Sequence, residues 1–257
     1  MEWQVNLLKR SIKKKNKLNK LNNFLDNQEG KTCLDIGCGT GAISYSLRKQ
    51  DGTWHSIDSD ENCVILTKKL VKERVHQMDA TKTNFEDNKF DTVIALDIIE
   101  HIEDDDSLVK ELHRIIKDDG KLYVTTPHIS KTAILNYIKN WIGLTPDKYG
   151  HVRAGYTTKQ LKEKLEKNGF KVEKTGTYSK FFTEIVELVI NKTYTAMNKN
   201  KTKGYNTDVS PSTQEELNKT KGIKIYNKLH KPISLFTKLD YIWPCKGYGL
   251  IMKTRKC

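Results

Sequence analysis

Glycines and a carboxylate with the spacing of a ligand site occur in the segment CLDIGCGTGAIS, residues 33–44. Asp35 lies inside an apolar run, and Gly37, Gly39 and Gly41 follow it on alternate positions. Glycine is favoured where a backbone turns sharply or approaches another group closely. The loop could therefore hold a phosphate, a nucleoside or an amino-acid ligand, and the rest of the chain has to discriminate between them.

Acidic residues recur at regular places further along the chain. Asp58, Asp79 and then Asp97 with Glu100 each follow an apolar run. A carboxylate in the place of Asp58 can accept hydrogen bonds from both hydroxyls of a ribose. A row of carboxylates suits a cationic nucleoside, whereas Asp35 would repel a pyrophosphate. The pattern therefore favours S-adenosylmethionine, which carries a sulfonium and an ammonium, over a nicotinamide dinucleotide.

These residues need a scaffold that brings the ends of several strands together. Strand-like apolar runs alternate with helical patterns between residues 31 and 178, which predicts an α/β, doubly wound, Rossmann-like sheet. Ligands of such sheets bind beyond the carboxyl ends of the strands. The expected strands are residues 31–37, 54–60, 75–81, 90–97, 120–127, 170–178 and 247–256.

The remaining pattern divides the chain into parts. A helix is expected at 105–120, with Gly120 as its C-cap, and another at 157–169. The N-terminal residues alternate leucines with lysines, which predicts a basic amphipathic arm that covers the core. The expected parts are the arm at 1–28, a core at 29–180, a helical insertion at 181–246 with a mobile linker at 198–222, and the last core strand at 247–257.

Five ordered blocks together resemble the class I S-adenosylmethionine-dependent methyltransferases: LDIGCGTG, SIDSD, QMDAT, FDTVIALDIIEHIED and LHRIIKDDGKLYVTTP. The resemblance covers residues 31–175 and implies a seven-stranded sheet whose last strand is antiparallel. It also implies that the loop lies beside the methionine moiety, that Asp58 binds the ribose and that Asp97 lies near the transferred methyl. The cofactor residues so implied are Asp35, Gly37, Gly39, Gly41, Asp58, Ser59, Asp79, Ala80 and Asp97.

The alternative interpretation of the same residues is structural: the glycines serve tight turns, and Asp58 and Asp79 cap helices.

Histidines supply candidate bases for catalysis. Transfer of a methyl group to a hydroxyl requires removal of the hydroxyl proton. His101, His128 and His151 follow predicted strands on loops above the carboxyl edge, so they are the catalytic candidates, with His151 first. The other histidines are expected to be structural or exposed; they are His55, His76, His113 and His230.

The segment D-x-x-E-H resembles the E-x-x-E-H of ubiquinone-type O-methyltransferases and of small-RNA 2′-O-methyltransferases, in which such residues hold a divalent metal. The resemblance implies a site for magnesium or manganese made by Asp97, Glu100, His101 and His151. Here Asp97 replaces the first glutamate and is one carbon shorter. The alternative is that Glu100 and His101 line the site without a metal.

Charge is distributed unevenly over the 257 residues, whose net charge is +13. Residues 1–30 hold 7 basic and 3 acidic side chains, residues 31–130 hold 13 and 19, and residues 131–257 hold 25 and 10. Basic ends suggest a phosphate-bearing substrate, an anionic membrane surface or nucleic acid. Aromatic and basic residues in 181–246 suggest contact with an apolar acceptor or an anionic membrane.

The expected activity is methyl transfer from S-adenosylmethionine to a hydroxyl of a small or lipid-like acceptor. RNA methylation and a non-catalytic, cofactor-binding partner protein remain alternatives. The five cysteines include no C-x-x-C pair, and no apolar run is long enough to span a bilayer. A cytoplasmic protein, in peripheral contact with a membrane if the acceptor is lipid-like, is therefore expected.

Overall fold

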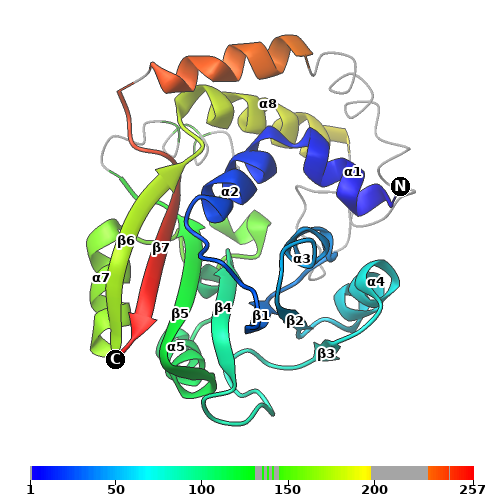
Figure 1. The fold of residues 1–257 in the computed structure, drawn as a ribbon. Coiled ribbons are helices and arrows are strands. Elements are labelled where there is room, and N and C mark those ends of the chain that lie inside the picture. Colours follow the sequence, from blue (N-terminus) through cyan, green and yellow to red (C-terminus); the bar gives the residue numbers. More distant parts are fainter. Residues whose placement is uncertain are drawn as a thin grey trace.

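The computed structural model describes residues 2–130, 135, 138, 141, 145–197, 231–242 and 244–257. Within these residues, seven strands form one sheet in the order β3-β2-β1-β4-β5-β7-β6 (Figure 1). β7 runs antiparallel to β5 and β6, and the other pairs are parallel. The prediction of an α/β sheet with an antiparallel last strand is confirmed. The strands are β1 (Thr32–Ile36), β2 (Thr53–Asp58), β3 (Val75–Gln77), β4 (Phe90–Leu96), β5 (Ile116–Pro127), β6 (Phe170–Tyr178) and β7 (Gly249–Lys256).

Helices cover both faces of the sheet, which explains why its central strands are apolar along nearly their whole length. In β4 every residue except Asp91 is buried. Side chains of α5 and α7 join the core on one face, and those of α2 and α3 join the core on the other. The helices are α1 (Trp3–Arg10), α2 (Ile12–Asn22), α3 (Ala42–Leu47), α4 (Glu61–Val71), α5 (Asp105–Ile115), α7 (Thr158–Lys167) and α8 (Phe181–Met197), with short 3₁₀ turns η1 (Ile99–His101), η2 (Pro146–Tyr149) and η3 (Lys238–Tyr241).

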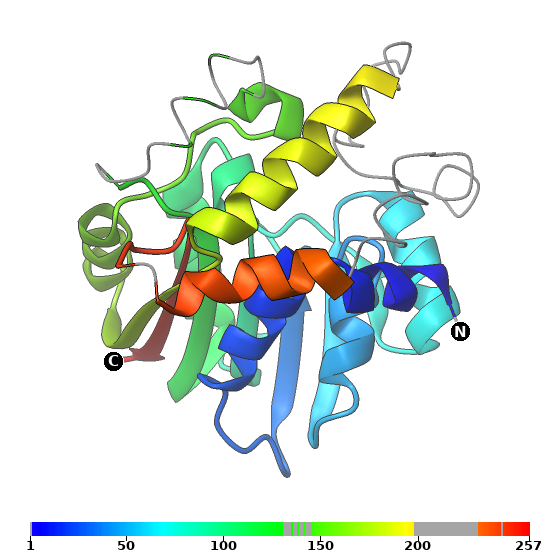
Figure 2. The ribbon, with the colours of Figure 1, turned by 90° about the horizontal axis from the view of Figure 1, so that it is seen from above.

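The carboxyl ends of the parallel strands meet at one edge of the sheet, the upper edge in Figure 1. Seen from above, α1, α2, α8 and the helix at 231–237 lie across this edge (Figure 2). Residues far apart in the sequence therefore surround the strand ends, where a ligand of a doubly wound sheet binds.

The N-terminal arm consists of two helices, α1 and α2. Ser11 separates them, and its hydroxyl accepts a hydrogen bond from the backbone N–H of Lys14, which caps α2. Trp3, Val5 and Leu8 of α1 are buried, so the apolar side of the arm packs on the core. The predicted linker at 198–222 and the histidine at 230 lie outside the described residues.

Three predicted boundaries are wrong by four residues or more, one of them the start of the fifth strand, which lies at Ile116 instead of 120. The helix expected at 105–120 ends at Ile115, because Ile116 already pairs with Phe90 at the start of β5. Gly120 is not a C-cap: a Cβ added there would lie 2.6 Å from the Cγ2 of Ile116, so close packing in the strand irregularity requires glycine. The third strand ends at Gln77 instead of 81.

Among the described residues, no helix combines the length and the apolar character that a membrane span requires.

Candidate active site

The three glycines of the loop after β1 all have positive φ angles, but a side chain would meet different surroundings at each position. A Cβ at Gly41 would lie 2.9 Å from the Cα of Thr67 in α4, and one at Gly37 would lie 3.0 Å from the Cδ1 of Ile98. Packing against the backbone of α4 therefore requires glycine at position 41, and the positive φ together with the nearby side chain of Ile98 favours glycine at position 37. A Cβ at Gly39 would meet nothing within 4 Å, so open space lies in front of this residue.

Asp58 ends β2 and holds the loop in place. Its Oδ2 accepts a hydrogen bond of 2.8 Å from the backbone N–H of Gly39, and its Oδ1 accepts one of 3.0 Å from the N–H of Asp60. Burial raises the pKa of Asp58, although these hydrogen bonds oppose the effect. A carboxylate has about four acceptor positions, so it can accept further donors from a ligand. Ser59 beside it is exposed.

Asp79 and Ala80 follow β3 and have different surroundings. The carboxylate of Asp79 accepts 2.8 Å hydrogen bonds from both the backbone N–H and the hydroxyl of Thr81, which bends the chain after the strand. Asp79 is exposed, whereas Ala80 belongs to the main core. The helix-capping role considered for Asp79 is therefore wrong, because no helix begins directly after it, and its position at the carboxyl edge is the one expected for a cofactor residue.

Asp35 lies beneath the loop and is only 2% exposed. Its carboxylate accepts a 2.5 Å hydrogen bond from the hydroxyl of Ser44 in α3. Burial raises the pKa of Asp35 to about 6, and the hydrogen bond from Ser44 opposes the effect. The carboxylate can act on a cationic ligand through space, but little of its surface is open to direct contact.

Asp97 follows β4 with φ of 50°, an unusual value for a residue with a side chain. Its Oδ2 accepts a 2.6 Å hydrogen bond from Lys17 of α2, and its Oδ1 accepts one of 2.6 Å from the hydroxyl of Thr125. Burial would raise the pKa of Asp97, but the ammonium of Lys17 and these hydrogen bonds outweigh it and hold the pKa low. Asp97 is therefore an anion that the N-terminal arm already neutralises.

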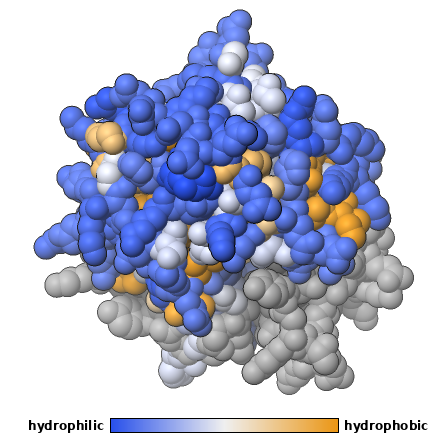
Figure 3. Space-filling view, turned by 90° about the horizontal axis from the view of Figure 1, so that it is seen from below, coloured by the Kyte–Doolittle hydropathy of each residue, from blue (hydrophilic) through white to orange (hydrophobic). Residues whose placement is uncertain are grey.

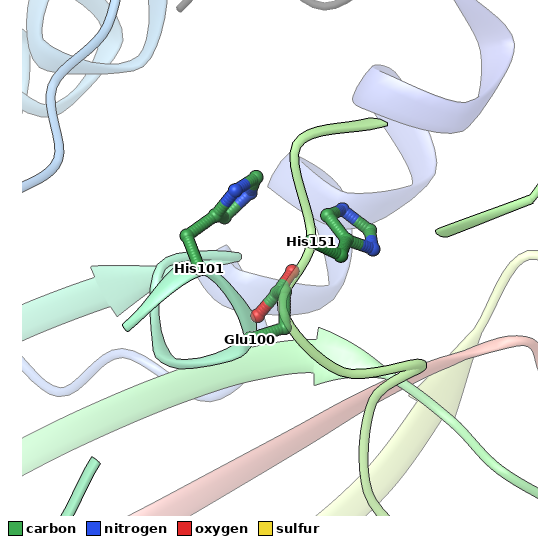
Figure 4. Close-up of side chains that lie close together, drawn as sticks. All are labelled: Glu100, His101 and His151. Atoms are coloured by element: carbon green, nitrogen blue, oxygen red, sulfur yellow. The ribbon is translucent and has the colours of Figure 1, made fainter. Parts of the chain in front are cut away.

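Glu100, His101 and His151 form a compact group at the same edge (Figure 4). One ligand atom of each lies within 4.8 Å of the others. Glu100 is fully buried, and neither of its carboxylate oxygens has a hydrogen-bond partner among the described residues. Burial, and then the charge of Asp97, raise the pKa of Glu100.

The two histidines of this group are oriented by the loop at 146–151. The Nδ1 of His101 lies 2.8 Å from the carbonyl of Gly150, so it carries the proton and leaves the lone pair of Nε2 available. The two rings are perpendicular, with centroids 4.6 Å apart. Burial and the neighbouring His101 lower the pKa of His151 to about 4, so its ring is neutral at neutral pH.

Two sequence-based assignments need correction. Asp97, expected in the metal set, does not belong to the compact group, because Lys17 and Thr125 hold its carboxylate. His128, expected as a base, is only 4% exposed, and its two ring nitrogens face the carbonyl of Gly247 at 2.9 Å and the hydroxyl of Thr158 at 3.2 Å. Both nitrogens serve to join β5 to its neighbours, which leaves none for catalysis.

A family model described as a methyltransferase domain matches residues 9–175, from the end of α1 into β6. The chain belongs to this family. With the sheet order and the loop after β1, it is a class I S-adenosylmethionine-dependent methyltransferase by family and fold.

The relatives of this methyltransferase include enzymes named for different substrates. Phosphoethanolamine N-methyltransferase 2 of Caenorhabditis elegans is 31% identical over 179 residues, which are 63% of this chain and 38% of the relative. A ubiquinone biosynthesis O-methyltransferase of Actinobacillus pleuropneumoniae is 28% identical over 107 residues, 38% of this chain and 46% of the relative. The methyltransferase thus spans less than half the length of either.

A solved structure supports the fold. The S-adenosylmethionine-dependent methyltransferase of Archaeoglobus fulgidus superposes with a TM-score of 0.59 over 100% of both chains, at 17% identity. At that identity the likeness concerns the fold alone.

The residues of the loop fit S-adenosylmethionine. Open space lies in front of Gly39, the carboxylate of Asp58 accepts the hydrogen bond of its N–H, and the carboxylate of Asp35 places negative charge beneath the loop. A cationic nucleoside suits such a site, because opposite charges attract more strongly in partly buried surroundings.

Residues contributed by distant segments were missed by the sequence analysis. Lys17 was assigned only to a covering helix, and Thr125 and Tyr178, whose hydroxyl lies 3.3 Å from Oδ1 of Asp97, were read as strand residues. The run of lysines at 13–17 was the available signal, but composition does not show which lysine faces inward.

Proposed function

We propose that this methyltransferase transfers the methyl group of S-adenosylmethionine to a hydroxyl oxygen of a small or lipid-like acceptor. The observation that carries the proposal is the group Glu100, His101 and His151 at the end of β4, at the same edge as the glycine loop. A buried carboxyl group and two imidazoles within 4.8 Å can exchange protons where an acceptor hydroxyl would have to lose its own.

The bound cofactor supplies an electrophilic methyl group. In the proposed reaction, the oxygen–methyl bond forms as the sulfur–methyl bond breaks, and the proton of the hydroxyl must leave toward the protein. Asp58 and the loop would fix the nucleoside end, and the three-residue group would orient the hydroxyl. Such alignment supplies a large part of the acceleration of a direct displacement.

The group also fits a divalent cation. Glu100 has two oxygens without partners, His101 presents Nε2, and the low pKa of His151 keeps its lone pair available. Neutral imidazoles and a carboxylate are common ligands of transition metals, and manganese accepts such a mixed set. A cation held there would lower the pKa of the acceptor hydroxyl. A pKa of about 4 makes His151 alone a weak base, whereas the raised pKa of Glu100 opposes the negative charge that a cation would need, so activity with and without a chelator decides between the two versions.

Methylation of an amine is the second candidate, favoured by the 31% identity to a phosphoethanolamine N-methyltransferase. An ammonium must also lose a proton before it attacks, so the same group would serve. The atom that carries the methyl group in the product, oxygen or nitrogen, distinguishes methylation of a hydroxyl from methylation of an amine.

The test is incubation with methyl-labelled S-adenosylmethionine and fractionated cell extract, followed by identification of the labelled product. His151→Ala is expected to lower turnover by about 10²–10⁴ while calorimetry shows unchanged affinity for the cofactor. His76→Ala is the matched control, because His76 stacks on His55, away from the group.

Chelation separates the two versions of the proposal. Loss of activity with EDTA and its recovery with manganese or magnesium supports the cation, and unaffected activity supports His151 as the base. Turnover that neither EDTA nor the His151 substitution changes would exclude both roles.

A further inference from the structure

The helix at 231–237, with η3 after it, exposes most of its apolar residues and buries two of its polar ones. Leu235 is 66% exposed, Tyr241 87% and Ile242 78%, whereas Thr237 and Asp240 are 8% and 9% exposed. Surface helices of soluble proteins show the opposite arrangement, with the apolar stripe facing the core. This segment lies outside the part of the chain that the family model matches.

The inverted orientation is fixed by Asp240. Its carboxylate accepts hydrogen bonds from the backbone N–H groups of Phe182 at 2.8 Å and of Lys180 and Thr183 at 3.2 Å each. These groups begin α8, where a negative charge also interacts favourably with the helix dipole. Because Asp240 must face α8, the residues on the opposite side of the segment must face outward.

The outward side has a consistent composition. Leu235, Leu239 and Ile242 follow the spacing of about three and four that places side chains on one helix face. Two exposed lysines, Lys231 and Lys238, lie along the same side. Aliphatic side chains, an exposed tyrosine and lysines on one face are the composition of helices that lie in the interface of an anionic membrane.

The position of this face suits such a contact. The segment forms the outermost layer above the carboxyl edge of the sheet, at the top of Figure 1 and nearest the viewer in Figure 2. The opposite face of the molecule, seen from below in Figure 3, is mainly hydrophilic, with apolar side chains in small groups. Contact through 231–242 would turn the candidate active site, rather than the far face, toward the bilayer.

We infer that residues 231–242 dock this methyltransferase on the surface of an anionic lipid bilayer. The exposed apolar side chains would enter the boundary between headgroups and acyl chains, and Lys231 and Lys238 would contact the anionic headgroups. The inference does not depend on the identity of the acceptor, because binding is measured without cofactor or substrate.

Flotation with vesicles tests the inference on the full chain. The wild type is expected to float with an equal mixture of phosphatidylcholine and phosphatidylglycerol, and much less with phosphatidylcholine alone. The triple variant Leu235→Ser, Tyr241→Ser, Ile242→Ser should lower the partition coefficient between vesicles and water by about tenfold or more. The reason is that the variant removes less apolar surface from water when it binds. Lys238→Ala should lower it by about fivefold, and the effect should shrink at high salt.

Ile65→Ser is the matched control, because Ile65 is an exposed apolar residue of α4 (41%) away from this face, and it should float like the wild type. No flotation of the wild type at low salt would overturn the inference, as would equal flotation of the triple variant. A dimer in solution that the triple variant disrupts, without vesicle binding, would assign the face to a second copy of the chain instead.

Discussion

The cofactor side and the acceptor side of the candidate site are built in different ways. On the cofactor side, Asp35 binds Ser44 nine residues away, and Asp58 binds Gly39 19 residues away. On the acceptor side, Asp97 binds Lys17 across 80 residues, and His101 binds the carbonyl of Gly150 across 49. The first half is made within successive strand–helix units, and the second is assembled from the arm, η1 and a loop.

This difference separates positions that local chemistry defines from positions that only packing defines. A glycine loop and a strand-ending aspartate satisfy each other's backbone groups, so their motif is complete in the sequence. Lys17 and the Glu100 group have no such local partner, and Glu100 has no hydrogen-bond partner among the described residues. Variants of the cofactor half should therefore change cofactor binding and stability, and variants of the Glu100 group should change turnover.

Of the substitutions Asp35→Asn, Asp58→Ala and Lys17→Ala, the first should change the pH dependence of stability most. Burial raises the pKa of Asp35 from 3.8 to about 6, so the folded protein binds its proton more tightly than the unfolded chain does. The resulting stabilisation is fully present below pH 3.8 and is lost as the pH rises through about 6. It amounts to roughly 2–3 kcal/mol, since one pKa unit corresponds to about 1.4 kcal/mol.

Urea unfolding across this pH range provides the measurement. The asparagine variant should lack the part of the decrease that Asp35 causes, whereas Asp51→Asn, at an exposed loop position, should keep it. The absolute stability of the variant also includes the cost of burying an amide N–H, so the slope with pH is the informative quantity. An unchanged slope would show that Asp35 does not titrate in this range.

Asp58→Ala should weaken binding of S-adenosylmethionine by about 1.5–3 kcal/mol, because charge-assisted hydrogen bonds to the ribose are lost. The substitution also removes the acceptor of the Gly39 N–H, so part of the loss comes from the loop. Asp58→Asn is the control: it keeps one acceptor oxygen for the loop but loses the charge. Calorimetry with both variants separates the contributions, and full affinity in Asp58→Ala would contradict a ribose role.

The sequence predicted the sheet, its antiparallel last strand and the positions of Asp58 and Gly39, because apolar periodicity and turn chemistry are local. It also predicted that His101 and His151 lie at one edge, because both follow strands that end there. It failed for His128 because burial between β5 and α7 depends on the final packing, and strand position alone does not show it. For the same reason, the sequence could not show that Lys17, rather than one of the other five lysines or the arginine of the arm, binds Asp97.

Lys17→Ala should give the smallest effects: a small loss of stability and a small gain in affinity for the cofactor. Its ion pair with Asp97 is partly exposed, 16% for Lys17 and 34% for Asp97, so its loss should cost about 1 kcal/mol of unfolding free energy or less. Removing this ammonium should also tighten binding of the cationic cofactor by about two- to fivefold, because the carboxylate of Asp97 is no longer neutralised. Lys15→Ala, an exposed position on the same helix, should change neither quantity. Weaker cofactor binding in Lys17→Ala would instead show that the arm must be held down for the cofactor to bind, and the two halves of the site would then depend on each other through α2.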